Sequence, residues 1–349
     1  MRIALIIALT ILTSSFLSAQ TKQDSILAII TNDIDSMPEG FAISIALLNN
    51  DSTTFVGFSK SNTILTQVTN KDSLFEIGSI TKVFTSTVLA HHIISHKIKP
   101  NTPINKVFPF KFNNKTKLTY LSLSNHTSGM HRLPSNILPL LYKNPTNPYK
   151  DYSYELLDNY LKEDLQLINK AQYSYSNLGA GVLAYALAKK NKTSFETLLK
   201  ATVLDKYKMS STSYNFNVSY FGIGADNNKT ENWQMNSLIG AGGLISNTND
   251  LSTFIHAQFD TENKELALTR KETFSINDNF SIGLGWHIFD SNTKNEKFWH
   301  NGGTGGYTSS ISFRTTNNTG VIILSNISPL HKNSSKIDEL CFKLLELLK

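Results

Sequence analysis

Residues Phe75–Ala90 read FEIGSITKVFTSTVLA, and the rest of the chain is interpreted around this stretch. An apolar run ends at Gly78, and a helical pattern opens at Ser79 and continues to about Lys97. Because Ser79 and Lys82 are separated by about one helical turn, a helix places both side chains on one face. A helix N-terminus also supplies unpaired N–H groups and the positive end of the helix dipole. The spacing therefore predicts a serine nucleophile beside a lysine base.

A lysine can take the proton of a serine hydroxyl only when its own amine is neutral. Burial and nearby positive charge lower a lysine pKa and favour that neutral form. Apolar residues on more than one side of the expected helix indicate that it is buried, namely Val83, Phe84, Val88, Leu89, Ile93 and Ile94. A Ser-x-x-Lys pair also arises by chance on solvated helices. The pair alone is therefore also compatible with a surface helix that has no catalytic role.

A second group of polar residues lies in Tyr173–Gly181, which reads YSYSNLGAG and precedes an expected helix. A tyrosine near a lysine ammonium can ionise and relay a proton, which is the role predicted for Tyr175. The amide of Asn177 offers a donor and an acceptor to a substrate. The alternative is a packing tyrosine beside a helix-capping asparagine.

A third group lies in Phe298–Phe313, which reads FWHNGGTGGYTSSISF. Its glycines lie along an expected strand edge, where a substrate backbone could approach closely and pair as an extra strand. Gly302 and Gly303 are the candidate edge residues, and His300 opens the element. A flexible loop is the alternative, whereas a nucleotide-binding loop lacks the strand-then-helix frame that it needs.

The first twenty residues, MRIALIIALTILTSSFLSAQ, have the pattern of a secretory signal peptide with cleavage after Ala19. A membrane anchor is the alternative, but the apolar run is short for a span. We expect export to the periplasm or cell surface of a bacterium, and no stable membrane span in the mature form. The single Cys341 cannot form an internal disulfide and is expected to be a buried residue of the last helix.

The charge balance is mildly basic, with 33 Lys and Arg against 27 Asp and Glu and a net charge of +6. The basic residues are spread along the chain without a basic run or a basic patch interleaved with aromatics. This distribution indicates solubility and argues against a nucleic-acid partner. His91 and His92 are adjacent and diverge on a helix, so we expect them and His96 to face solvent rather than a metal.

The order of the expected elements defines an α+β fold with one catalytic domain over residues 20–349. Strands are predicted at Phe41–Leu48, Thr53–Phe58, Ser281–Phe289, Tyr307–Phe313 and Gly320–Ser325, and helices at Gln23–Ser36, Leu118–Asn125, Tyr152–Leu161, Leu178–Lys190, Phe195–Lys206 and Ser334–Leu348. Strands from both chain ends imply one antiparallel sheet flanked by helices. Residues 20–105 and 227–349 would form an α/β lobe, and residues 106–226 an inserted helical lobe.

The three groups in this order make the chain similar to the serine beta-lactamase and penicillin-binding-protein superfamily, of which Ser-x-x-Lys is one motif. The resemblance is to the branch that holds class C beta-lactamases, D,D-peptidases and esterases, and it spans about Phe41–Asn326. Six stretches carry it: Ser79–Lys82, LSNHTSGM (Leu123–Met130), Tyr175-Ser176-Asn177, AGGLISNTNDLSTF (Ala241–Phe254), SIGLGW (Ser281–Trp286) and His300-Asn301-Gly302.

The resemblance implies an acyl-enzyme on Ser79, with proton transfer by Lys82 and Tyr175 and substrate contacts from Asn177. The backbone N–H groups of Ser79 and Gly303 would bind the oxyanion. The resemblance implies no cofactor and no metal, a small-molecule or peptide substrate, and a monomer.

One departure concerns the third motif, where class C beta-lactamases usually carry Lys-Thr-Gly and this chain carries His300-Asn301-Gly302. A lysine there supplies a fixed charge near a substrate carboxylate, whereas a histidine is only partly charged at neutral pH. The substitution favours peptidases, amidases and esterases over an efficient beta-lactamase. His300 would then orient a distal polar group of the substrate or assist proton transfer.

The acyl donor stays open between a beta-lactam, a D-Ala-type peptide, another D-amino-acid amide and an ester. A non-catalytic penicillin-binding or cell-wall-binding protein of the same fold is the alternative from another functional class. For an enzyme, we expect substrate specificity to lie in the loops Leu133–Lys150 and Tyr214–Asn236.

Overall fold

The computed structural model of the protein describes residues 23–168, 171–215 and 217–348. Its main sheet has nine strands in the order β3-β2-β1-β13-β12-β11-β10-β9-β8. The strands are β1 (Ala42–Asn49), β2 (Ser52–Ser61), β3 (Ile64–Val68), β8 (Phe274–Asn277), β9 (Phe280–Ile282), β10 (His287–Phe289), β11 (Lys297–Gly303), β12 (Thr308–Arg314) and β13 (Thr319–Ser325). Neighbouring strands pair antiparallel throughout.

Both ends of the chain contribute strands to this sheet, as the sequence predicted, and strands from the two ends lie side by side in it. Strand β1 pairs with β13, and Ile45 lies opposite Ile323. Both strands are buried along nearly all of their length. A strand covered on both faces needs apolar residues at successive positions, which explains the runs FAISIALL and GVIILS.

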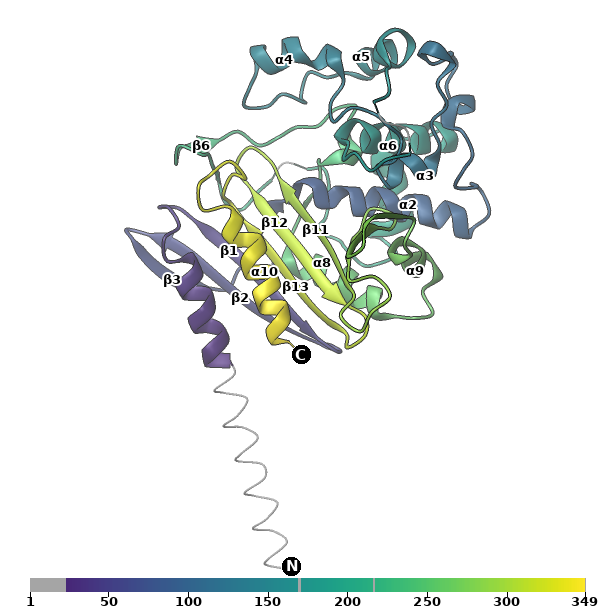
Figure 1. Cartoon of the computed structure of the whole chain (residues 1–349). Coiled ribbons are helices and arrows are strands. Elements are labelled where there is room, and N and C mark those ends of the chain that lie inside the picture. The colour runs from purple at the N-terminus through teal and green to yellow at the C-terminus, as the bar shows by residue number, and fades with distance from the viewer. Residues whose placement is uncertain (1–22, 169–170, 216, 349) are drawn as a thin grey trace, which may run out of the picture.

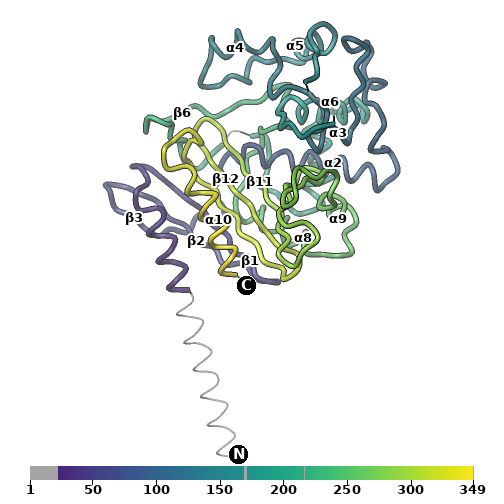
Figure 2. Tube along the Cα trace, in the orientation of Figure 1, coloured from purple at the N-terminus to yellow at the C-terminus, as the bar shows by residue number. Residues whose placement is uncertain are grey.

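Helices cover both faces of the sheet (Figures 1 and 2). On one face the helix over residues 23–34 lies beside α10 (Ser335–Leu347), and Ile34 shares a core with Leu340 and Ile323. Cys341 is fully buried in that core, as predicted. The other face carries α2 (Thr81–Ile94) and α8 (Thr248–Phe259), with α9 (Lys264–Arg270) packed against α2.

The middle of the chain supplies helices beyond α2, away from the sheet (Figure 1). They are α3 (Tyr120–Ser124), α4 (Leu138–Lys143), α5 (Tyr154–Asn159), α6 (Asn177–Asn191) and α7 (Phe195–Leu199). A close approach fixes α6, because a Cβ added to Gly181 would lie 2.5 Å from the side chain of Leu238. The division into lobes at about residues 106 and 226 stays a prediction.

Two predicted elements differ in the structure. The expected strand Ser281–Phe289 is a hairpin, because β9 and β10 pair with each other and Gly285 between them has φ +82°. That conformation suits glycine and reverses the chain within the SIGLGW stretch. The helix expected from Ser79 begins with a 3₁₀ turn over Gly78–Ile80, and α2 follows from Thr81 to Ile94.

The predicted signal peptide, residues 1–19, lies outside the described residues. Within the described ranges, no helix has the length and apolar character needed to cross a membrane.

Candidate active site

Ser79 and Lys82 meet at the start of α2. The 3₁₀ turn Gly78–Ile80 carries Ser79, and the Lys82 amine lies 2.9 Å from its hydroxyl oxygen. The same amine donates to the carbonyl oxygen of Ala241 at 2.7 Å. The sequence prediction that one face presents both groups therefore agrees with the geometry, and a second contact fixes the amine in place.

The Lys82 side chain is buried, with 2% of its residue surface exposed. Burial, which disfavours the charged form, holds the pKa of Lys82 well below its ordinary value of 10.5, and the nearby charge of Arg132 adds to this. No carboxylate forms an ion pair with it in the described parts of the chain. The environment thus favours the neutral amine that can accept a proton.

Tyr175 lies close to two basic side chains. The Lys82 nitrogen is 4.8 Å from the centre of its ring, and the central carbon of the Arg132 guanidinium is 5.2 Å from it. Burial raises the pKa of Tyr175 to about 12, and its interaction with the Ser79 hydroxyl acts in the opposite direction. The phenol is therefore protonated at neutral pH and can donate a proton, and its role as a proton relay stays a prediction.

Asn177 opens α6 beside these groups. Ser176 precedes it as the helix N-cap, and its hydroxyl accepts from the Gly179 N–H at 2.8 Å. The Asn177 amide nitrogen donates to the Tyr149 hydroxyl at 3.2 Å. Its amide oxygen is buried and accepts no hydrogen bond from the described residues. That oxygen is the candidate acceptor for an N–H group of the substrate.

The glycines of β11 let this strand approach the turn that carries Ser79. A Cβ added to Gly302 would lie 2.0 Å from the carbonyl oxygen of Ile77. Gly78 has φ +50°, and a Cβ added there would lie 2.5 Å from the backbone nitrogen of Gly303. Both positions therefore require glycine, and the Gly303 N–H comes next to the Ser79 turn.

His300 lies beneath Tyr175 rather than in the cavity wall. Its side chain is 1% exposed, and its Nδ1 is 2.6 Å from the carbonyl oxygen of Asn301. The centre of its ring is 6.3 Å from that of Tyr175 and 5.2 Å from that of His287. Burial holds the pKa of His300 well below 6.5. Contact with a distal polar group of the substrate, one of the two roles predicted from the sequence, does not fit this position.

Two further imidazoles complete a buried cluster, His126, His287 and His300. The centre of the His126 ring is 4.5 Å from that of Tyr175, and the Ser176 N–H donates to its Nδ1. His287 Nε2 lies 2.7 Å from the Tyr173 hydroxyl oxygen. Burial lowers the pKa of His126 and brings that of His287 to about 4, so the cluster is uncharged at neutral pH.

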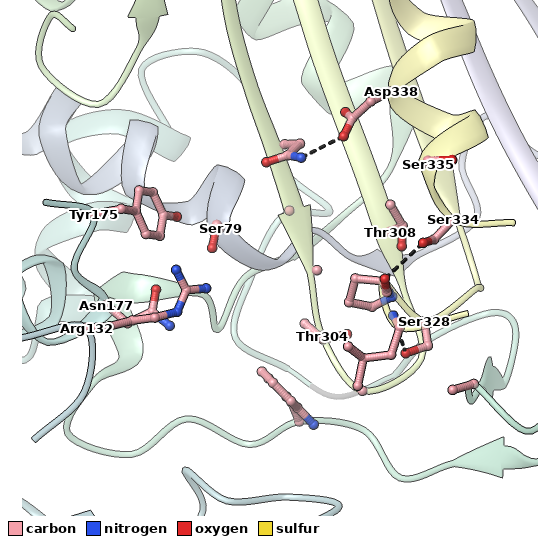
Figure 3. A pocket seen from close by; sticks show the side chains of 18 of the residues that line it. Ser79, Arg132, Tyr175, Asn177, Thr304, Thr308, Ser328, Ser334, Ser335 and Asp338 are labelled. Atoms are coloured by element: carbon pink, nitrogen blue, oxygen red, sulfur yellow. Dashed lines mark hydrogen bonds between the residues drawn. The ribbon is translucent and has the colours of Figure 1, made fainter. Parts of the chain in front are cut away.

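A cavity of about 890 Å³ opens over Ser79. Figure 3 shows Arg132, Tyr175 and Asn177 on one side of Ser79, and Ser334, Ser335 and Asp338 on the other. Predicted site residues in its lining are Ser79, Tyr175, Asn177, Gly302 and Gly303. Lys82 and His300 lie behind it.

Sequence reasoning missed several lining residues. Arg132 lies two residues after the stretch Leu123–Met130, and that proximity was the available signal. Tyr149 and Trp233 belong to the two loops expected to set specificity, and both line the cavity. Trp233 donates from its ring nitrogen to the Thr146 carbonyl oxygen at 2.8 Å, which joins the two loops.

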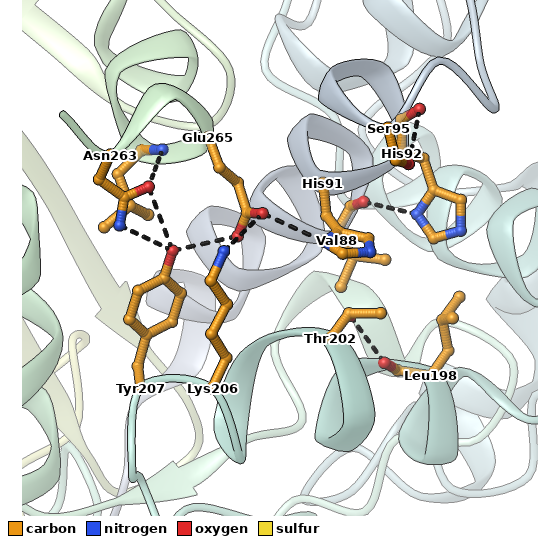
Figure 4. Close-up of polar contacts among 11 residues, drawn as sticks. Val88, His91, His92, Ser95, Leu198, Thr202, Lys206, Tyr207, Asn263 and Glu265 are labelled. Atoms are coloured by element: carbon orange, nitrogen blue, oxygen red, sulfur yellow. Dashed lines mark hydrogen bonds and ion pairs between the residues drawn. The ribbon is translucent and has the colours of Figure 1, made fainter.

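The histidines of α2 differ partly from prediction. His92 is 1% exposed, with its Nε2 2.9 Å from the Asn191 side-chain oxygen, so it does not face solvent. Nδ1 of His91 lies 3.1 Å from the carboxylate of Glu265 (Figure 4). His96 is exposed. The described residues hold no group of three or more His, Cys, Asp or Glu side chains placed to bind a metal ion.

Known proteins of similar sequence carry related activities. A D-alanyl-D-alanine-carboxypeptidase/endopeptidase AmpH of Escherichia coli (strain K12) is 23% identical over 299 residues, 76% of this chain and 74% of the relative. A beta-lactamase of Pseudomonas fluorescens is 24% identical over 259 residues, 71% of this chain and 69% of the relative.

Solved structures share the fold. A beta-lactamase/D-alanine carboxypeptidase from Pseudomonas syringae has a TM-score of 0.76 at 17% identity, over 94% of this chain and 99% of the other. An octameric penicillin-binding protein homologue from Pyrococcus abyssi has a TM-score of 0.77 at 18% identity, over 93% of this chain and 77% of the other.

The family model described as Beta-lactamase matches residues 44–342, which include every residue of the site described above. The chain therefore belongs to the beta-lactamase family, and at that level it is a hydrolase with the fold of the beta-lactamases and penicillin-binding proteins.

Proposed function

We propose that the protein is a serine acyl hydrolase that works through an acyl-enzyme on Ser79. The observation that carries the proposal is the 2.9 Å contact between the Ser79 hydroxyl and a buried Lys82 amine whose pKa is lowered. A neutral amine at that distance can take the hydroxyl proton as the oxygen attacks a carbonyl carbon.

In the acylation step the Ser79 oxygen bonds to the carbonyl carbon, and the carbonyl π electrons move to the oxygen. The N–H groups of Ser79 and Gly303 would hold that oxyanion. When the bond to the leaving group breaks, the phenol of Tyr175 donates its proton to the leaving group and regains one from Lys82. In deacylation a water molecule attacks the ester carbon, its proton returns through the same two residues, and Ser79 is released.

The proposed acyl donor is a beta-lactam or a D-Ala-type peptide, supported by the names of the relatives. An ester or a D-amino-acid amide is the alternative, and the third motif favours it. His300 is buried and its pKa is lowered, so this motif offers no fixed positive charge to a carboxylate. A non-catalytic protein that only binds penicillin or cell wall would form no acyl adduct on Ser79 and would not turn over a substrate.

We also propose that the chain is exported to the periplasm or cell surface and acts as a monomer without a cofactor or metal. Edman sequencing of protein recovered from the periplasm, with an N-terminus at Gln20, would support the export proposal. A retained Met1 would contradict it.

A panel of substrates on the purified protein tests the proposed function. Nitrocefin, a D-Ala-D-Ala peptide and 4-nitrophenyl esters are assayed with the unmodified protein, Ser79→Ala and Ser95→Ala. Ser95 is an exposed serine at the far end of the same helix and is the matched control. We expect turnover of at least one substrate that is lost in Ser79→Ala and kept in Ser95→Ala. Turnover retained in Ser79→Ala would contradict the proposal.

A further inference from the structure

We propose that Arg132 is the anion-binding group of this site and that it selects acyl donors that carry a carboxylate on the Asn177 side of the reacting carbonyl. This inference rests on the proposed function, because it names the substrate class of the same site.

Few of the side chains that line the cavity are ordinarily charged. The ordinarily charged side chains among the lining residues are Arg132 and Asp338, apart from His287, whose burial brings its pKa to about 4. His300 of the third motif is buried and Lys82 lies behind the wall. Arg132 is therefore the one fixed cation that the described lining offers to a ligand.

The backbone holds Arg132 against the Tyr175-Ser176-Asn177 motif. The carbonyl oxygen of Arg132 accepts from the Leu178 N–H at 3.1 Å. The preceding carbonyl, of His131, accepts from the Ser176 hydroxyl at 2.7 Å. Both bonds go to residues that flank Asn177, so the Arg132 segment is fixed relative to the side chains beside the nucleophile.

The Arg132 guanidinium is positioned by its surroundings, but no carboxylate of the described residues neutralises its charge. Its central carbon lies 5.2 Å from the centre of the Tyr175 ring, and Figure 3 shows it beside Asn177, facing the space over Ser79. No carboxylate of the described residues forms an ion pair with it. A planar guanidinium with free N–H groups matches a carboxylate through two parallel hydrogen bonds.

The charge on the opposite side of the cavity also favours binding of a substrate carboxylate at the Arg132 end. Asp338 lies there, and its carboxylate accepts from the Asn301 amide at 2.7 Å. A substrate carboxylate would meet a negative neighbour at that end and a positive one at Arg132. The geometry therefore places the anion on the helical side of Ser79 and not along the α10 side.

The test compares acyl groups of equal length. The probes are 4-nitrophenyl hexanoate, which is neutral, and mono-4-nitrophenyl adipate, which ends in a carboxylate. The measured quantity is the ratio of kcat/KM for adipate to kcat/KM for hexanoate. In Arg132→Gln we expect this ratio to fall about tenfold or more, since a charge-assisted pair is lost. Arg132→Lys, which keeps the charge and loses the fork, should give an intermediate ratio.

The use of a ratio of kcat/KM values cancels a second effect of the Arg132 substitutions, which acts through Lys82. Arg132 also lowers the pKa of Lys82, and losing that influence changes the rates of both esters alike. Lys143→Gln is the matched control, because Lys143 is an exposed basic residue of α4 outside the cavity lining. It should leave the ratio unchanged. High salt should lower the ratio in the unmodified protein and have little effect in Arg132→Gln.

The outcomes separate this inference from the proposed function. If the ratio in Arg132→Gln equals that of the unmodified protein, whether or not both esters react more slowly, the role of Arg132 is overturned. Ser79-dependent hydrolysis then still stands. Absence of Ser79-dependent turnover of both esters, of nitrocefin and of the D-Ala-D-Ala peptide would overturn the proposed function itself.

Discussion

The amine of Lys82 lies 2.9 Å from the hydroxyl of Ser79 and forms no ion pair with a carboxylate of residues 23–168, 171–215 and 217–348. A buried lysine of this kind costs stability at neutral pH, because the unfolded chain can bind a proton that the folded chain releases. The lowered pKa of Lys82, on which the proposed chemistry depends, can therefore be measured through the pH dependence of the free energy of unfolding.

Lys82→Met should make the free energy of unfolding less dependent on pH. The pKa of Lys82 is held well below 10.5 in the folded state, so the unfolded state binds more protons in the window below 10.5. Stability therefore rises with pH across this window in the unmodified protein. Urea unfolding at pH 7 and pH 9.5 measures the rise, which should be smaller in Lys82→Met and unchanged in the exposed control Lys143→Met. An equal rise in all three proteins would contradict the assignment.

Gly302→Ala should damage both the fold and the reaction. The added Cβ would lie 2.0 Å from the Ile77 carbonyl oxygen, a backbone atom two residues before Ser79. Relief of that clash must displace β11 or the Ser79 turn, at a cost of about 2 kcal/mol in the free energy of unfolding. Ester turnover per folded molecule should also fall, because the Gly303 N–H moves with the strand.

Gly320→Ala is the control for this substitution. Gly320 lies in β13, where the nearest atom to an added Cβ is 3.2 Å away. Comparable losses of turnover per folded molecule in the two variants would show that the contact between β11 and the Ser79 turn has no special role.

Acid should destabilise the protein through the buried imidazoles. The pKa of His287 is about 4 in the folded state against an ordinary value of 6.5, so the unfolded state binds the extra proton as the pH falls below 6.5. The loss through His287 approaches about 3 kcal/mol at the acid end of this window. In His287→Gln, urea unfolding between pH 7 and pH 5 should show a smaller loss than in the unmodified protein.

Glu76 has the opposite effect on the pH dependence of stability over part of the same pH range. Burial raises its pKa from 4.5 to about 7, so its contribution is lost as the pH rises through that value. The comparison of variants, rather than the slope of one protein, therefore isolates His287. His96→Asn is the control, since His96 is exposed with φ +56°, a conformation that asparagine tolerates. If His287→Gln and His96→Asn lose stability equally on acidification, the imidazole cluster is not the cause.

Glu265→Gln should lower stability without affecting the site. The Glu265 carboxylate is 5% exposed and contacts His91 at 3.1 Å, Lys206 at 2.9 Å and the Tyr207 hydroxyl at 3.1 Å (Figure 4). Because Lys206 is 45% exposed, solvent weakens its share, and we expect a loss of about 1–2 kcal/mol. Asp205→Asn, in the exposed pair Lys200–Asp205, should cost less than about 1 kcal/mol. Equal losses would contradict the role of burial.

The sequence predicted the central features because they depend on local spacing. One helical turn joins Ser79 to Lys82, and Tyr175 and Asn177 flank the N-cap of α6. The sequence also predicted strands at Phe41–Leu48 and Gly320–Ser325 in one sheet built from both chain ends, and the corresponding strands β1 and β13 pair with each other.

Other features depend on packing between distant segments and left no local pattern. The side on which His300 lies follows from the register of β11, whose residues alternate in burial. The hairpin at β9 and β10 depends on a positive φ at Gly285, which the alternating sequence SIGLGWHIF does not reveal. Arg132 gained its position from hydrogen bonds to Ser176 and Leu178, far along the chain.

The most direct measurement of the central claim is the mass of the protein during turnover. An activated ester is mixed with the protein, and the reaction is quenched in acid. The intact mass of the protein is measured first, and peptide mapping then locates the acyl group. We predict a mass increase of one acyl group on Ser79, absent from Ser79→Ala and present in Ser95→Ala. An acyl group mapped to another residue, or undiminished turnover in Ser79→Ala, would contradict it.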